Sequence, residues 1–89
     1  MKRWHIFFSG RVQGVGFRYT SRQVAERYDV SGWVKNLPNG SVEMIVEGPS
    51  DQLKKYIADV SQATHGHVTD MPVTKSDATG EFSSMEIRH

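Results

Sequence analysis

Apolar and polar residues alternate along this chain with two different periods, one typical of strands and one typical of helices. Alternation in twos predicts strands over residues 4–9, 30–37 and 41–47. Apolar residues spaced by three and four predict helices over residues 19–28 and 51–63. The apolar stripe of the second helix contains Leu53, Tyr56, Ile57, Val60 and Ala63. Each helix is therefore expected to lie with one side against a sheet.

Two groups of residues that break regular structure lie on either side of the third strand. Pro38-Asn39-Gly40 contains the Asn-Gly pair that is typical of tight turns, so the strands before and after it are expected to form a hairpin. Gly48-Pro49-Ser50 ends the third strand, and Ser50 is expected to be the N-cap of the second helix.

The rest of the chain completes the predicted fold. Residues 68–75 are expected to form a strand in which Pro72 favours an edge position or a bulge, and residues 82–88 a short last strand. This order predicts an α+β fold, a ferredoxin-like α/β sandwich of the type βαββαβ with a short extra C-terminal strand. Its two helices would pack on one face of an antiparallel sheet. The length predicts a single domain over residues 1–89.

Composition and charge exclude several classes of function. The chain has no cysteine, which excludes a disulfide framework, a thiolate nucleophile and a cysteine-based zinc site. Its net charge of +1 gives no general attraction to nucleic acid or to a membrane surface, so any anion site must be local. No apolar run approaches the length that spans a membrane. These features favour a cytoplasmic protein with neither a nucleic-acid nor a membrane partner.

The segment between the first strand and the first helix carries the strongest chemical signal. It reads Gly10-Arg11-Val12-Gln13-Gly14-Val15-Gly16-Phe17-Arg18. In such a turn the backbone N–H groups converge at the positive end of the helix, and glycines permit positive φ angles. Arg18 adds a planar guanidinium group that matches a phosphate in shape and charge. The segment is therefore predicted to cradle an oxyanion, above all a phosphoryl group. Its glycine spacing matches neither the Walker A loop nor the Rossmann fingerprint.

Asn36 is a second candidate, because it lies at the end of the second strand beside the predicted turn. A side-chain amide both donates and accepts hydrogen bonds, so it can hold and orient a water molecule. It can equally support the Pro38-Asn39-Gly40 turn alone, and the spacing by itself favours this second interpretation.

Other kinds of site are disfavoured. The element order also occurs in RNA-recognition domains, but the strand over residues 41–47 has no aromatic residue and two acids. His65 and His67 have no carboxylate cluster near them in the sequence, which argues against a metal site. Serine and threonine residues near the cradle have no evident base, which argues against a covalent nucleophile.

The cradle, Gly32-Trp33-Val34-Lys35-Asn36 and Asn39-Gly40-Ser41-Val42 together resemble the acylphosphatase family, over essentially the whole chain. The resemblance implies hydrolysis of the carboxyl–phosphate bond of acyl phosphates to a carboxylate and inorganic phosphate. It implies that the phosphoryl group is held by Val12, Gln13, Gly14, Val15, Gly16, Phe17 and Arg18. It also implies that Arg18 and Asn36 are catalytic and that Asn36 positions the attacking water, which reverses the preference for a turn role.

The same resemblance implies an enzyme with no metal and no other cofactor, a monomer for which inorganic phosphate is both product and inhibitor. The segment Thr64-His65-Gly66-His67-Val68-Thr69 departs from the pattern of many relatives, so the family predicts nothing for that loop. Similar modules begin larger carbamoyltransferase maturation proteins, but a chain ending at His89 is expected to be a free-standing enzyme. The alternative is a non-catalytic module that senses anionic metabolites.

Overall fold

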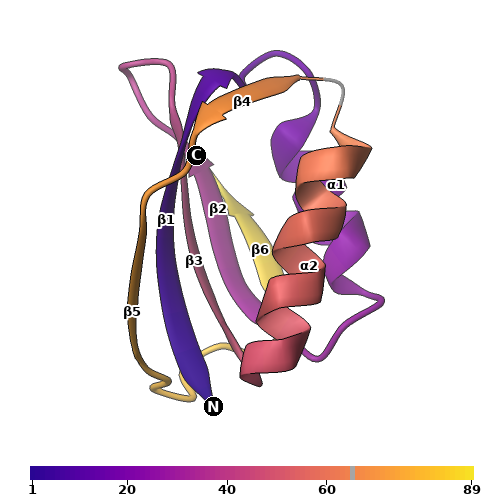
Figure 1. Ribbon diagram of the computed structural model, residues 1–89, viewed down its shortest axis with the longest axis vertical. Helices are drawn as coiled ribbons and strands as arrows, with labels where there is room; N and C mark the ends of the chain where they lie inside the picture. The colour runs from indigo at the N-terminus through magenta and orange to yellow at the C-terminus, as the bar shows by residue number, and fades with distance from the viewer. Residues whose placement is uncertain (65) are drawn as a thin grey trace.

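The computed structural model describes residues 1–64 and 66–89, over which the chain forms six strands and two helices (Figure 1). In chain order these are β1 (Lys2–Arg11), α1 (Phe17–Ala25), β2 (Ser31–Asn36), β3 (Val42–Gly48), α2 (Ser50–Ala63), β4 (His67–Asp70), β5 (Val73–Asp77) and β6 (Met85–Arg88). The predicted ferredoxin-like sandwich is confirmed, and the strand expected over residues 68–75 is divided into two.

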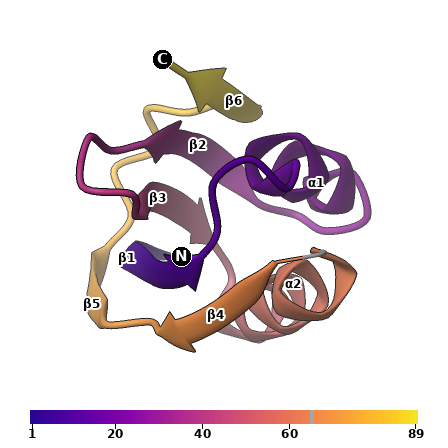
Figure 2. The ribbon, with the colours of Figure 1, turned by 90° about the horizontal axis from the view of Figure 1, so that it is seen from above.

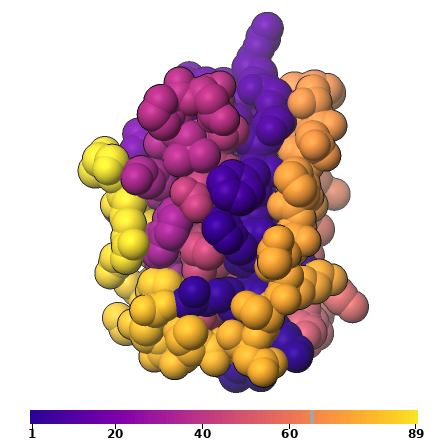
Figure 3. All heavy atoms as spheres, turned by 90° about the vertical axis from the view of Figure 1, so that its left-hand side faces the viewer, coloured from indigo at the N-terminus to yellow at the C-terminus, as the bar shows by residue number. Residues whose placement is uncertain are grey.

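The strands form one sheet in the order β4-β1-β3-β2-β6, and β5 also pairs with β1. The prediction of a fully antiparallel sheet is wrong for β6, which runs parallel to β2. β5 is antiparallel to β1, whereas β2 runs in the same direction as β1 because each is antiparallel to β3. After β5 the chain crosses one end of the sheet and turns back, so β6 takes the direction of β2. Figure 3 shows this crossing on the side that the helices leave open.

Both helices cover the same face of the sheet, and the hydrophobic core lies between the two layers (Figure 2). The sheet contributes fully buried side chains from its central strands, where Ile6 of β1 faces Met44 of β3 and Met44 faces Val34 of β2. α1 contributes Phe17, Ser21, Val24 and Ala25, and α2 contributes Leu53, Tyr56, Ile57 and Val60. The apolar stripes read from the sequence are therefore the buried faces of the helices, except that Ala63 at the end of α2 is exposed.

Pro72 separates β4 from β5, which is why residues 68–75 do not form one strand. Its carbonyl oxygen accepts a hydrogen bond of 3.2 Å from the backbone N–H of Phe7, but a proline has no N–H to return. The two short strands pair with different parts of β1, β5 with Lys2 to Ile6 and β4 with Ser9 to Arg11. The expected edge position of Pro72 is thus observed. The last strand is also shorter than predicted, since β6 begins at Met85.

The helix ends differ from the predicted ones in two places. α1 begins at Phe17 and ends at Ala25, and the next three residues continue as tighter turns closed by bonds to the third residue back. Ser50 is not the N-cap of α2 but its first residue. Pro49 takes the N-cap position, with an extended backbone and a carbonyl that accepts the Leu53 N–H at 2.9 Å. An extended backbone is the one that proline readily adopts, which explains the shift by one residue.

The crossing between β5 and β6 is fastened to the sheet by one buried carboxylate. Glu47 of β3 is 3% exposed, and its oxygens accept bonds from Arg3 Nε at 2.7 Å and from the backbone N–H groups of Thr79 and Gly80 at 2.9 Å. Burial by itself would raise the pKa of Glu47, but the bonds from Thr79, Arg3 and Gly80 outweigh it and lower the pKa from 4.5 to about 2. Sequence reasoning missed this role, because an acid in a strand resembles an ordinary surface residue.

Glu47→Gln is expected to lower the free energy of unfolding at pH 7 by roughly 2–3 kcal/mol. The folded-state pKa lies below the unfolded one, so this stabilisation is present above pH 4.5 and is lost as the pH falls towards 2. Urea unfolding at several pH values should show the difference between the wild type and Glu47→Gln shrinking over that window. Glu86→Gln, at an exposed position of β6, is the matched control and should change little. A difference that persists unchanged at pH 2 would contradict the assignment.

Candidate active site

The connection from β1 to α1 forms an open turn built on two glycines. Gly14 has a φ of 75° and Gly16 a φ of 76°, and a Cβ atom added to either would meet no atom within 4 Å from the described residues beyond its chain neighbours. Glycine is therefore not needed at these positions to avoid a steric clash. It is needed for the positive φ, which residues other than glycine rarely adopt. The two glycines thus let the chain turn from the strand into the helix while leaving the inner side of the loop open.

Apolar side chains fix this loop to the core. Val12 and Phe17 are buried at its two ends, and Val15 packs partly against the core between them. The rings of Phe17 and Phe8 lie 4.8 Å apart between their centroids. Burial of these side chains anchors the loop at both ends, which is what a preorganised binding loop needs.

The backbone N–H groups of residues 12–19 make no hydrogen bond to any other residue in the described ranges 1–64 and 66–89. The first internal bond of α1 is donated by Thr20 to the Gly16 carbonyl at 2.9 Å, and none of the side chains that the structure describes caps the helix. Amides left without partners at a helix N-terminus carry partial positive charge and attract anions. The loop can therefore donate several hydrogen bonds to one bound oxyanion.

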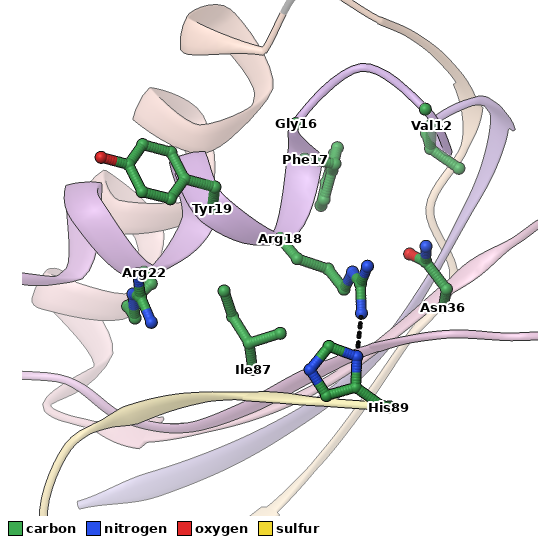
Figure 4. Close-up of a pocket in the computed structure, with 10 residues that line it drawn as sticks. Val12, Gly16, Phe17, Arg18, Tyr19, Arg22, Asn36, Ile87 and His89 are labelled. Atoms are coloured by element: carbon green, nitrogen blue, oxygen red, sulfur yellow. Dashed lines mark hydrogen bonds between the residues drawn. The ribbon is translucent and has the colours of Figure 1, made fainter.

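Arg18 and Asn36 face the same hollow from opposite sides (Figure 4). The hollow has a volume of about 400 Å³, and Gly14 and Gly16 also line it. Arg18 extends from the first turn of α1, and Asn36 from the end of β2. Of the residues predicted to hold the phosphoryl group, Gln13 and Val15 do not line the hollow with their side chains, since Val15 packs against the core.

The Arg18 guanidinium is held by Arg88 and His89. Its Nη1 donates to the Arg88 carbonyl at 3.3 Å. It also contacts His89 Nδ1 at 3.2 Å, as Figure 4 shows. His89 also lines the hollow, as does Arg22, one helical turn after Arg18. Sequence reasoning missed this side of the hollow. The four-residue spacing of the two arginines was the available signal, since it places them on one face of a helix.

α1 is itself fixed by a buried hydrogen bond to α2. The hydroxyl of Tyr56 donates to the Ser21 carbonyl at 2.8 Å, and the Ser21 hydroxyl donates to the Phe17 carbonyl at 2.8 Å. Burial raises the pKa of Tyr56, so the hydroxyl keeps its proton at neutral pH. This network fixes the turn of α1 that carries Arg18.

The Asn36 side chain is not used by the adjoining turn. That turn is held by Asn39, whose Oδ1 accepts bonds from the backbone N–H and the hydroxyl of Ser41 at 3.0 and 2.6 Å. The Gly40 N–H donates to the Leu37 carbonyl at 3.2 Å and completes it. Asn36 hydrogen-bonds through its side chain to none of the residues that the structure describes. This arrangement leaves the amide available to the hollow and argues against the turn role.

No group of three potential ligands for a metal ion occurs among residues 1–64 and 66–89. His67 is exposed in β4, whereas His65, named with it as a potential ligand, lies outside the described residues. In the same part of the chain, neither helix has the length and apolar character that crossing a membrane requires.

Comparison with known proteins points to one family. The sequence model of the acylphosphatase family matches residues 4–87. An acylphosphatase of Syntrophus aciditrophicus is 43% identical over 88 residues, which are 98% of this chain and 92% of that protein. The crystal structure of the acylphosphatase from Bacillus subtilis superposes on this structure with a TM-score of 0.93 at 37% identity. The superposition covers 100% of both chains. An acylphosphatase structure from Coxiella burnetii gives a TM-score of 0.86 at 30% identity, over 98% of this chain and 92% of that one. The chain therefore belongs to the acylphosphatase family, and it is an enzyme that hydrolyses acyl phosphates.

Proposed function

We propose that the phosphoryl group of the acyl phosphate is held by residues 12–18 and that Asn36 positions the attacking water. The observation that carries this proposal is a row of backbone N–H groups that have no partner among residues 1–64 and 66–89, beside a hollow that Arg18 and Asn36 share. In this assignment Val12, Gln13, Gly14, Val15, Gly16 and Phe17 act through the backbone. Arg18 adds a charged fork to the same oxygens.

The chemistry suits a site of this kind. The water oxygen forms a bond to phosphorus as the bond from phosphorus to the carboxyl oxygen breaks. The leaving group departs as a carboxylate, which is weakly basic and needs little protonation. The proton of the water passes to a phosphate oxygen, and inorganic phosphate is the second product. Charge develops mainly on the phosphoryl oxygens, so fixed donors and correct placement can supply most of the catalysis.

We expect inorganic phosphate to compete with the substrate and to perturb the backbone amide NMR signals of residues 12–18. Gly14→Val should weaken phosphate inhibition at least 10-fold, because a side chain at φ 75° distorts the cradle. The matched control is Gly80→Val, since Gly80 also has a φ of 75° and open space around it but lies in the crossing after β5. Each variant should lose stability on the order of 1–3 kcal/mol, Gly80→Val the more of the two because the Gly80 N–H also donates to Glu47, and only Gly14→Val should lose phosphate. Equal phosphate inhibition in the two folded variants would contradict the cradle.

We expect hydrolysis of acetyl or benzoyl phosphate to survive extensive chelation without loss of rate. The loop amides and Arg18 would stabilise the negative charge of the phosphoryl group, which metal ions stabilise in other phosphoryl-transfer enzymes. The measurement compares kcat before and after treatment with EDTA and dialysis. A loss of more than 10-fold that one divalent ion restores would contradict this mechanism.

The oligomeric state and the cellular location of the enzyme are also part of the proposal. We propose a monomer in the cytoplasm that takes a small-molecule acyl phosphate, and the absence of cysteine from the sequence fits a reducing compartment. Size-exclusion chromatography with light scattering tests the monomer directly.

A further inference from the structure

The side chain of Gln13 leaves the cradle to which its backbone belongs. Its amide nitrogen Nε2 donates two hydrogen bonds, one of 2.7 Å to the Leu37 carbonyl and one of 2.8 Å to the Ser41 carbonyl. A primary amide nitrogen carries two hydrogen atoms, so both of its donors are used. The side chain is half-buried, which strengthens these bonds relative to exposed ones.

The two carbonyls that Gln13 reaches belong to the residues next to the Asn36–Val42 pair, both on the side of the turn. Asn36 of β2 faces Val42 of β3, Leu37 follows Asn36, and Ser41 precedes Val42. Leu37 and Ser41 also bond to each other, the Leu37 N–H donating to the Ser41 carbonyl at 2.9 Å. The Gln13 side chain, which comes from the cradle, is therefore hydrogen-bonded to both sides of the hairpin next to Asn36.

Asn36 needs such support because the sheet holds it on one side only. The parallel ladder between β2 and β6 ends at Lys35, paired with Arg88, one residue before Asn36. Beyond Asn36 the turn residues Pro38, Asn39 and Gly40 are exposed. The position of Asn36 relative to the cradle is thus not fixed by the ladder with β6.

We infer that Gln13 is a positioning residue, which holds the amide of Asn36 at a fixed distance and direction from the phosphoryl group in the cradle. The inference rests on the proposed roles of the cradle and Asn36. Gln13 joins the element that places phosphorus to the element that aims the water, and in-line attack requires both to be correct at once. Displacing a reacting group by about 1 Å can cost about 100-fold in rate, so a loss of this connection should appear in kcat.

The first test is Gln13→Met, which keeps the length of the side chain and removes both donors. We expect the single-turnover rate with benzoyl phosphate to fall roughly 10- to 100-fold, while the inhibition constant for inorganic phosphate changes less than threefold. Gln52→Met on α2 is the matched control, because the Gln52 amide oxygen accepts a bond from the exposed Asp29 N–H away from the hollow, and it should leave both quantities unchanged. Gln13→Asn keeps a polar amide that is one methylene too short for both carbonyls. Gln13→Asn should lower the single-turnover rate by a smaller factor, and it replaces Gln13→Met as the test variant if Gln13→Met does not fold.

A double-mutant cycle separates positioning from general support of the fold. Gln13→Met should change the rate less than twofold when it is added to Asn36→Ala, because no aimed amide remains to be displaced. A full additional loss in that background would overturn the inference, as would a parallel loss of phosphate affinity or a normal rate in well-folded Gln13 variants. If Asn36→Ala itself has a near-normal rate, the failure lies in the proposed function and not in Gln13 alone.

Discussion

Arg18→Ala is expected to lower kcat/KM for acyl phosphates by roughly 1,000-fold or more and to abolish measurable inhibition by inorganic phosphate. Arg18 is the charged donor in the hollow that lies nearest the open N-terminus of α1. It would contact the phosphoryl oxygens in the bound substrate and in the transition state alike. Binding and turnover should therefore fail together. Steady-state kinetics and phosphate titration, with circular dichroism to confirm folding, measure both effects.

Arg18→Lys should restore little of either quantity. A lysine keeps the positive charge but loses the planar pair of donors, and it also loses the contacts of Nη1 with Arg88 and His89 that orient the guanidinium. Arg27→Ala, an exposed arginine just beyond the end of α1, is the control for the general effect of removing one positive charge. If Arg27→Ala weakens phosphate inhibition as much as Arg18→Ala does, the effect is long-range electrostatics and not a site.

The fold was predictable because each element carries its own pattern. The stripe of α2 is buried from Leu53 to Val60, and the turn at Pro38-Asn39-Gly40 lies where the Asn-Gly pair predicted it. The direction of β6 was not predictable, since it depends on where the chain crosses after β5, and the residues of that crossing carry no periodic pattern. Pro72 marked an edge correctly, but whether a proline bends a strand or divides it depends on the partner, here β1.

The candidate site was predictable in its backbone and not in its side-chain orientations. Glycines between a strand and a helix indicate a positive φ whatever the rest of the fold does, and both Gly14 and Gly16 have one. The spacing of Asn36 could not decide between a water-binding role and a turn role. In the structure Asn39 holds the turn, which supports the proposed water-binding role of Asn36. Gln13 illustrates the general limit, because no pattern in the sequence tells where the side chain of a loop residue points.

Asn36→Ala is expected to lower kcat by roughly 100- to 1,000-fold while the affinity for inorganic phosphate stays within threefold. The reason is that Asn36 would touch the attacking water and not the phosphoryl oxygens, so its contact gains strength only as the transition state forms. Single-turnover rates and phosphate titration separate the two quantities. Asn39→Ala is the control, because Asn39 holds the same turn. It should cost on the order of 1 kcal/mol of stability and leave kcat within threefold, since Gln13 still grips the hairpin.

The combination of Arg18→Ala with Asn36→Ala tests whether the two side chains act on one event. Water that is aimed correctly gains nothing when phosphorus is out of place, so the double variant should be only slightly slower than Arg18→Ala alone. Losses that multiply would mean that the two residues act independently, which the shared hollow does not predict. A near-normal kcat in a well-folded Asn36→Ala variant would remove the central step of the mechanism, and the water would then have to be placed by the cradle or by the substrate's own phosphate.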